Sequence, residues 1–191
     1  VFSWIIWEYE FMIRDGTFAA QLMRPIHPIF RDIAVNISYK TLTLVIILPT
    51  AIVLALFFRP TFNLQLWSLL AFMPALLLAF ALRFTFDWTI AQSAFWATRV
   101  SAINRLYEVT FVLLSGRFAP LALFPPAIGL LASILPFRWM LAFPIELFLG
   151  MLTPQQALAG FAAQIGWLVV AVVLMRFVWS RAVKKFSAVG T

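Results

Sequence analysis

The segment 115–144 constrains the fold more than any other part of this chain, because it is apolar and yet cannot form one straight helix. It reads SGRFAPLALFPPAIGLLASILPFRWMLAFP and contains five prolines and two glycines. A proline inside a helix removes a hydrogen-bond donor and clashes with the preceding turn, at a cost of about 3 kcal/mol or more. Broken backbone at membrane depth is tolerated only where protein or a water-filled cavity covers its polar groups. The segment therefore indicates a multi-pass channel, transporter or intramembrane enzyme, and argues against a simple anchor.

The composition indicates an integral membrane protein. Of the 191 residues, 64% are hydrophobic and 11% are charged, whereas a soluble domain is about half apolar and a quarter charged. The chain has no cysteine and a single histidine, His27, so thiolate sites and multi-histidine metal centres are excluded within it. The formal net charge is +7, but the basic residues cluster at the ends of apolar runs, as topology signals and lipid-headgroup contacts do. We therefore expect membrane lipids, and no nucleic acid, as partners.

The pattern of apolar and polar runs predicts an all-α, polytopic transmembrane helical bundle with about four full spans plus re-entrant helices on the outer side. A span requires about 20 apolar residues. Within a single domain, 1–191, the predicted segments are the end of a truncated span at 1–9, a cytoplasmic region at 10–40, spans at 41–58, 64–98, 100–115 and 161–180, a broken outer re-entrant segment at 116–150, and a cytoplasmic tail at 181–191. Because the first apolar run is too short to cross, we expect earlier spans to be missing from this sequence.

Charge asymmetry predicts the orientation. Short cytoplasmic segments carry an excess of Lys and Arg, so the region 10–40 and the tail 181–191 are both expected inside. Two inside ends require an even number of spans between them, and 64–98 is therefore interpreted as one long span that turns near Arg99. Within the cytoplasmic region, Asp15 or Thr17 is expected to cap a short helix over 17–23 that ends before Pro25, with Phe18, Leu22 and Met23 on one apolar face.

Several charged side chains lie in apolar surroundings, where a charge is costly and usually faces the bundle interior. The spacing predicts that Arg83 and Asp87 share one helix face, and that Arg105 and Glu108 do likewise. We interpret each pair as a self-neutralising structural pair, with a substrate or proton pathway as the alternative. Glu146 is expected at the outer rim.

The sequence contains no catalytic constellation. An intramembrane metalloprotease needs a second histidine, and an aspartyl protease needs paired aspartates in spans, where only Asp87 lies. A glycine-rich phosphate loop is also missing, so the chain is expected to lack an ATPase site of its own. We therefore expect no enzyme activity, no cofactor and no metal in this chain.

Three patterns in this order resemble the permease subunits of ABC exporters in the ABC-2 class, and are closest to a bacterial group of paired permeases of uncharacterised or antibiotic-exporter type. They are IRDGT and LMRPI at 13–17 and 22–26, AFW at 94–96 with LSGRFAPL, FP and LPF at 114–121, 124–125 and 135–137, and the basic ending KFSAVG at 185–190. Together they extend over most of the chain.

The resemblance implies a permease subunit of an ATP-driven exporter, multi-pass in the bacterial inner membrane. Such subunits have six spans, so about the first one and a half are expected to be missing here. The implied partners are a cytoplasmic ABC ATPase subunit, which binds the ATP, and a second permease subunit that forms a homodimer or a heterodimer with this one.

The resemblance also implies where functional residues lie. A coupling helix to the ATPase is expected at 16–24. The candidate coupling residues are Arg14, Asp15, Gly16, Thr17, Leu22, Arg24 and Pro25. The candidate outer-gate residues are Gly116, Pro120, Leu121, Phe124, Pro125, Pro136 and Phe137. The candidate intramembrane charges are Asp87, Arg105 and Glu108. Alanines at helix-contact spacing in two spans are Ala51, Ala55, Ala75 and Ala79.

Two other functions stay open from the residues alone. One is a secondary transporter driven by an ion gradient, which Asp87, Glu108 and Glu146 suggest and which predicts transport that survives ATP depletion. The other is a non-catalytic membrane assembly factor, in which the broken segment is only a packing element. The sequence leaves the substrate open, since a lipid, drug, peptide or glycan would each suit an apolar, aromatic path.

Overall fold

The computed structural model describes residues 4–58, 65–97 and 100–187 as a helical bundle. In chain order the elements are α1 (Trp4–Arg14), α2 (Phe18–Leu22), α3 (Pro28–Phe58), α4 (Leu66–Ala91), η1 (Gln92–Phe95), α5 (Ser101–Leu114), η2 (Leu121–Leu123), α6 (Pro126–Ile134), α7 (Pro136–Met140), α8 (Ala142–Phe148) and α9 (Pro154–Ser187). Within the described ranges, three helical stretches are long and apolar enough to cross a bilayer: Pro28–Phe58, Leu66–Phe95 and Pro154–Lys185. The predicted all-α membrane bundle is therefore confirmed.

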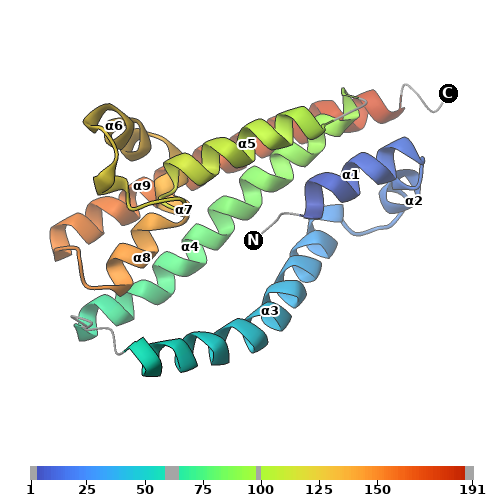
Figure 1. Ribbon diagram of the computed structural model, residues 1–191. Coiled ribbons are helices and arrows are strands. Elements are labelled where there is room, and N and C mark those ends of the chain that lie inside the picture. Colours follow the sequence, from blue (N-terminus) through green and yellow to red (C-terminus); the bar gives the residue numbers. More distant parts are fainter. Residues whose placement is uncertain (1–3, 59–64, 98–99, 188–191) are drawn as a thin grey trace.

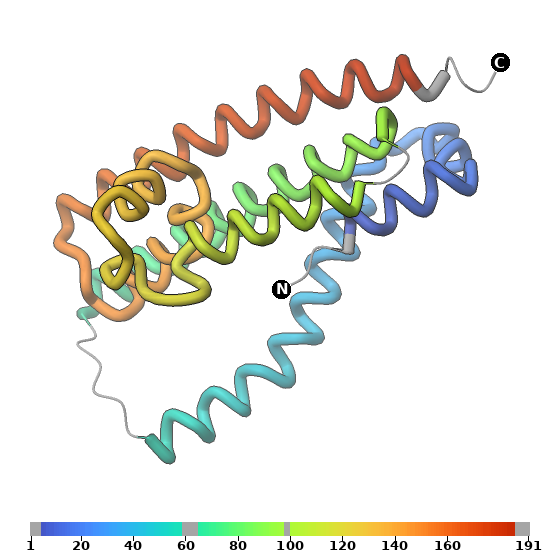
Figure 2. The backbone as a smooth tube through the Cα atoms, turned by 45° about the horizontal axis from the view of Figure 1, so that its top comes forward, coloured from blue at the N-terminus to red at the C-terminus, as the bar shows by residue number. Residues whose placement is uncertain are grey.

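The longer helices run back and forth between two ends of the molecule (Figures 1 and 2). Helix α3 leaves the end at which α1 and α2 lie, α4 returns to it, α5 leaves again and α9 returns. We call this the α1–α2 end; the short helices α6, α7 and α8 gather at the opposite, α6–α8 end. The last turns of α9 thus lie at the same end as α2, which is the arrangement that an even number of crossings requires.

Prolines set many of the helix boundaries. Pro28, Pro126, Pro136 and Pro154 each begin a helix, where the missing N–H is harmless because first-turn donors have no partner within the helix. Pro49 lies inside α3, and this helix is visibly curved in Figure 1, as expected of an internal proline.

Some helices begin or end where the sequence did not predict. Helix α3 begins at Pro28, so the predicted span 41–58 is the second part of a longer helix whose first turns include the charged residues Arg31 and Asp32. Helix α9 begins at Pro154 and not at residue 161. Helix α5 has 14 residues, which at about 1.5 Å per residue reach ~21 Å, less than the ~30 Å hydrocarbon core. The predicted turn near Arg99 lies outside the described residues, as does the end of the KFSAVG pattern.

Helices α4 and α9 form the centre of the bundle. Ala75 and Ala79 of α4 and Ala171 of α9 are buried, and small side chains let helix backbones approach closely in lipid. The sequence predicted that alanines in two spans form helix contacts, and this is confirmed for Ala75 and Ala79. Within this chain the prediction is wrong for α3, where Ala51 is exposed and Ala55 is half-buried.

Helix α8 packs against α9 at a glycine. A Cβ built on Gly160 would lie 2.0 Å from a ring carbon of Phe143, and the Phe143 side chain is buried. The rings of Trp139 and Phe161 lie 5.8 and 5.6 Å from that of Phe143, between centroids. Only glycine fits at position 160 without a shift of this aromatic cluster.

We predict that Gly160→Ala lowers the free energy of unfolding by about 1–3 kcal/mol, the usual cost of overpacking a core. Gly166→Ala in the same helix is the matched control. A Cβ there meets no heavy atom within 4 Å, and alanine favours the helix over glycine. Thermal unfolding of the purified chain in detergent tests both variants. Equal melting curves for Gly160→Ala and Gly166→Ala would contradict the described packing.

Candidate functional site

The turn between α1 and α2 depends on a glycine. Gly16 has a φ of +72°, a left-handed conformation that glycine adopts without steric cost. Thr17 follows at the N-cap position of α2 but makes no capping hydrogen bond. Its hydroxyl instead donates to the Met12 carbonyl at 3.4 Å, so the cap expected from Thr17 is not formed. Arg14 ends α1, and Asp15 is exposed beside it.

The inner face of α2 packs on aromatic rings. Phe18 is 0% exposed, and its ring centroid lies 5.2 Å from that of Tyr9 in α1 and 5.3 Å from that of Phe95 in η1. Leu22 is half-buried against the same cluster. A displacement of α2 therefore acts directly on α1 and on the end of α4.

The outer surface near α2 combines apolar and basic side chains. Met23 is 81% exposed, and Ile26 and Phe30 are each 63% exposed. Arg24 and Pro25 between them are also exposed. The sequence predicted that Met23 shares one apolar face with Phe18 and Leu22. In the structure Phe18 is buried and Met23 is exposed, so Met23 instead adds to an apolar surface at the α1–α2 end.

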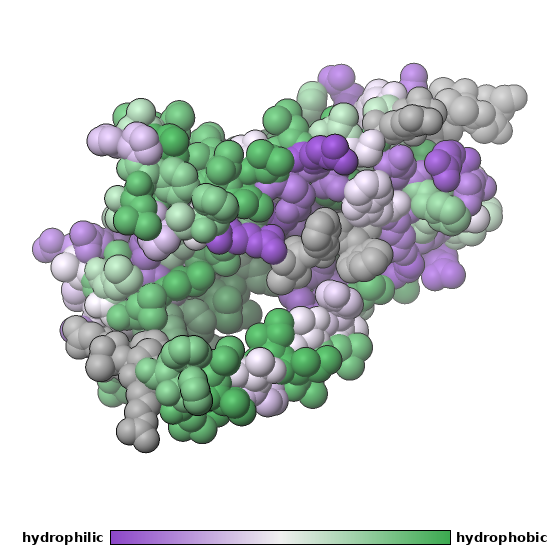
Figure 3. All heavy atoms as spheres, viewed as in Figure 1, coloured by the Kyte–Doolittle hydropathy of each residue, from purple (hydrophilic) through white to green (hydrophobic). Residues whose placement is uncertain are grey.

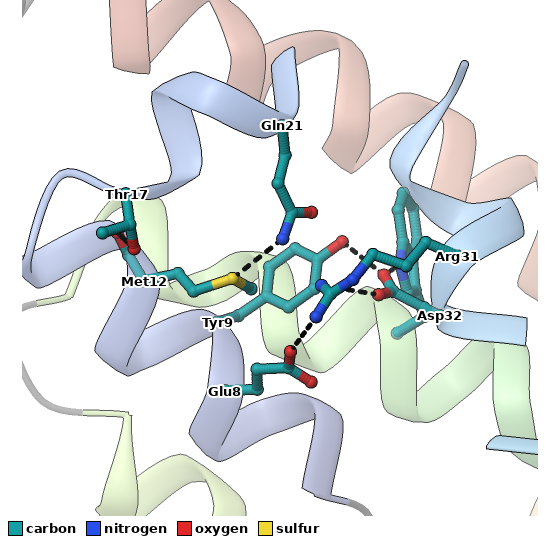
Figure 4. Close-up of polar contacts among 8 residues, drawn as sticks. Glu8, Tyr9, Met12, Thr17, Gln21, Arg31 and Asp32 are labelled. Carbon is teal, nitrogen blue, oxygen red and sulfur yellow. Dashed lines mark hydrogen bonds and ion pairs between the residues drawn. The ribbon is translucent and has the colours of Figure 1, made fainter. Parts of the chain in front are cut away.

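Asp32 joins three helices at this end (Figure 4). Its side chain is buried, and the Tyr9 hydroxyl and the Trp88 indole both donate to Oδ2, at 2.7 and 2.9 Å. Arg31 Nη1 lies 3.7 Å from Oδ1, and Arg31 Nη2 donates to Glu8 at 2.6 Å. A buried carboxylate needs such donors to offset its lost hydration. Asp32 thereby fastens α3 to α1 and α4.

His27 lies between the α2 segment and two long helices. Its ring centroid is 4.7 Å from that of Trp179 in α9 and 5.9 Å from that of Trp88 in α4. Partial burial lowers the pKa of His27 below its ordinary value, and the nearby Asp32 carboxylate opposes this shift. The imidazole thus contacts α4 and α9 together.

A second candidate site is an ionic cluster between α4 and α5. Arg83 Nε donates to Asp87 Oδ2 at 3.0 Å, and Arg83 Nη2 donates to Glu108 Oε1 at 2.7 Å. The Tyr107 hydroxyl donates to Asp87 Oδ1 at 2.8 Å. The ring of Phe111 lies 3.6 Å from the Arg83 guanidinium carbon. One guanidinium therefore joins two carboxylates in a setting where unpaired charge is costly.

The pairing in this cluster differs in part from the sequence prediction. The Arg83–Asp87 pair expected from the four-residue spacing is present. Glu108, however, pairs with Arg83 and not with Arg105, and Arg105 is exposed. The predicted Arg105–Glu108 pair is wrong because a buried guanidinium from the neighbouring helix lies within reach of Glu108.

The segment 116–150, which the sequence predicted to be a broken outer segment, is held by side chains that cap its short helices. The last carbonyls of a helix have no partner within that helix. Trp167 Nε1 donates to the Ile134 carbonyl at the end of α6 at 3.0 Å. Gln164 Nε2 donates to the Trp139 carbonyl of α7 at 2.9 Å, and the Ser68 hydroxyl donates to the Leu147 carbonyl of α8.

All three donors come from α4 or α9, so the short helices are tied to these two long helices. The Arg138–Glu146 ion pair, at 2.9 Å, adds a link between α7 and α8. Sequence reasoning did not single out Ser68, Gln164 or Trp167. Each of these residues could have been noticed as a polar group inside an otherwise apolar run. The carbonyl to which it donates depends on the tertiary fold and could not be predicted from the sequence.

The candidate gate residues are distributed over this outer segment. Gly116 follows α5 with a φ of +79°, and a Cβ there would lie 3.3 Å from Ala142 and 3.6 Å from Leu121. Phe137 packs on α5, with its ring centroid 6.1 Å from that of Tyr107, next to the ionic cluster. The other candidates flank or begin short helices: Pro120 before η2, Phe124 and Pro125 before α6, and Pro136 at the start of α7.

Removal of the Arg83 guanidinium tests the ionic cluster. We predict that Arg83→Gln lowers the free energy of unfolding by about 3–5 kcal/mol, because two carboxylates lose their buried partner. Arg105→Gln, which removes an exposed guanidinium, is the control and is expected to have little effect.

The triple variant Arg83→Gln, Asp87→Asn, Glu108→Gln restores charge balance and is expected to recover part of the loss. Thermal unfolding and the monodisperse yield in detergent measure all three variants. Equal stability of Arg83→Gln and Arg105→Gln would exclude the described pairing.

No curated protein and no solved structure matches the chain. A family profile described as ABC-2 family transporter protein matches residues 1–190, and this range takes in α2, the three long helices and the broken outer segment. The chain therefore belongs to the ABC-2 transporter family, as a multi-pass permease component of ABC transport.

Proposed function

We propose that the chain is the membrane-spanning permease subunit of an ATP-driven exporter, and that a separate cytoplasmic ABC ATPase subunit binds and hydrolyses the ATP. One observation carries this proposal: α4 and α9 connect the end with an exposed apolar and basic surface to the end with a capped, broken apolar segment. Family membership supports it. A second permease subunit, identical or different, completes the path, and the complex lies in the bacterial inner membrane.

In this proposal the ATPase binds the surface formed by Met23, Arg24, Ile26 and Phe30, which are exposed at the α1–α2 end. Helix α2 then transmits the movement inward through Phe18, whose ring contacts both α1 and η1. Because Asp32 holds α1, α3 and α4 together, these helices move as one unit. The His27 ring extends the contact to α9.

The outer segment acts as the gate in this proposal. Its short helices are capped from α4 and α9, so they follow those helices. Gly116, in its left-handed conformation, is the joint toward α5. A shift of α5 relative to α4 and α9 opens the apolar, aromatic path. An ion-gradient mechanism has less support, because Arg83 holds both Asp87 and Glu108.

We predict that Arg24→Glu reduces ATPase co-purification and permease-dependent stimulation of ATP hydrolysis by about tenfold or more, since reversing an interface charge costs several kcal/mol. Gly16→Val should act in the same direction, because a β-branched residue is strained at this φ. Arg117→Glu, an exposed arginine at the far end, is the control and should leave both readouts unchanged. Normal stimulation with Arg24→Glu and Gly16→Val would overturn the coupling role.

A test of the gate needs a variant that leaves the coupling to the ATPase intact. We predict that Gly116→Val lowers export in reconstituted vesicles while ATPase co-purification stays normal. A valine in this left-handed conformation strains the backbone by about 1–3 kcal/mol, which hinders the movement at residue 116. Gly129→Ala is the control, since a Cβ there meets no heavy atom within 4 Å. Unchanged export with Gly116→Val would contradict the role of this joint.

A further inference from the structure

A groove of about 690 Å³ lies at the α1–α2 end between the end of α4 and the last turns of α9. Its walls come from two helices that are distant in sequence. The lining residues are Thr89, Ser93 and Trp96 on one side, and Phe177, Val178, Arg181, Lys184 and Lys185 on the other. This groove has no part in the coupling and gating roles proposed above.

The groove has a cationic mouth. Arg181, Lys184 and Lys185 have the spacing that places side chains on one helix face, and the lining residues that the structure describes include no carboxylate. The Arg181 guanidinium carbon lies 4.8 Å from the centroid of the Phe177 ring, which holds the charge over the apolar wall. Such a mouth favours an anion.

The groove also has an apolar wall at the level of the membrane surface. Trp96 is 48% exposed and Phe177 is 55% exposed. The apolar run of α9 ends at Trp179, so the three cations lie in the turns just beyond the hydrocarbon. Tryptophan is enriched at this depth of the bilayer. A ligand here meets positive charge at one end and apolar side chains at the other.

The two hydroxyls in the groove already use their protons and can offer a ligand only acceptor lone pairs. Thr89 Oγ1 donates to the Thr85 carbonyl at 2.7 Å, and Ser93 Oγ donates to the Ile90 carbonyl at 2.6 Å. Each hydroxyl has one proton, so its lone pairs are left to accept a hydrogen bond. A ligand with hydroxyl donors beside its anionic group therefore matches the lining.

We propose that this groove is a binding site for an anionic glycerophospholipid of the cytoplasmic leaflet. Arg181, Lys184 and Lys185 bind the phosphate, and the acyl chain lies along Phe177 and Trp96. Basic pockets between transmembrane helices at the cytoplasmic surface are suited to anionic headgroups. A free phosphate would leave the apolar wall uncovered, and an acidic protein segment would have to insert beside Trp96 among the lipid headgroups. The bound lipid bridges η1 and α9.

The test uses the full chain in nanodiscs of phosphatidylcholine, with or without phosphatidylglycerol, and no ATPase. Native mass spectrometry counts the retained lipid, and thermal unfolding measures its stabilising effect. We expect the parent chain to retain phosphatidylglycerol over phosphatidylcholine, and the triple variant Arg181→Gln, Lys184→Gln, Lys185→Gln to bind it about tenfold more weakly or worse. Arg176→Gln, an exposed arginine on the same helix outside the groove, should bind like the parent.

Three results would overturn the proposal. Equal retention by the parent and the triple variant would exclude the cationic mouth as the site. Equal losses in Arg176→Gln and the triple variant would indicate attraction to charge in general. Full displacement of phosphatidylglycerol by inorganic phosphate, with no effect of Trp96→Ala, would indicate a plain anion site. Weaker lipid retention in Trp96→Ala supports the role of the apolar wall.

Discussion

This structure depends on one constraint: helices that end within an apolar region leave backbone carbonyls that need hydrogen-bond donors. Lipid offers no hydrogen bonds, so protein must provide them. Ser68, Gln164 and Trp167 provide three, each for a different short helix. Because all three side chains lie on α4 or α9, the outer segment is positioned by the central helix pair. The close packing of α8 on α9 at Gly160 fixes the same relationship sterically.

Buried charges are likewise satisfied by side chains from neighbouring helices, at two places in the bundle. Asp32 is satisfied by Tyr9 and Trp88 from two other helices, and Arg83 is shared by Asp87 and Glu108 across α4 and α5. Each arrangement removes the cost of an isolated charge, and each connects α4 to a neighbour. Helix α4 is thereby linked to α1 and α3 through Asp32 and to α5 through Arg83.

Local signals in the sequence predicted some of these features and not others. The prolines of 115–144 predicted a broken segment, and the four-residue spacing predicted the Arg83–Asp87 pair, because both effects act within one helix or turn. The partner of Glu108 and the carbonyls bound by Ser68 and Gln164 lie on other helices, so no spacing rule could identify them. The predicted span 41–58 covers only part of α3, because the charges of Arg31, Asp32 and Lys40 placed the first turns outside the membrane, although charged residues can continue a helix.

Helix α3 has a consequence for how the protein responds to its surroundings. Its most apolar 18-residue window has no residue buried inside the chain, and apolar side chains dominate its surface in Figure 3. The uncharged run 41–58 reaches ~27 Å, close to the ~30 Å hydrocarbon core. A hydrophobic stretch that does not match the local bilayer thickness is accommodated by tilting or bending of the helix, or by local thinning of the bilayer. Because Asp32 holds the start of α3 beside Tyr9 and Trp88, bilayer thickness sets the angle at which this helix meets the rest of the bundle. A change in membrane thickness therefore changes the force on the hydrogen bonds of Asp32.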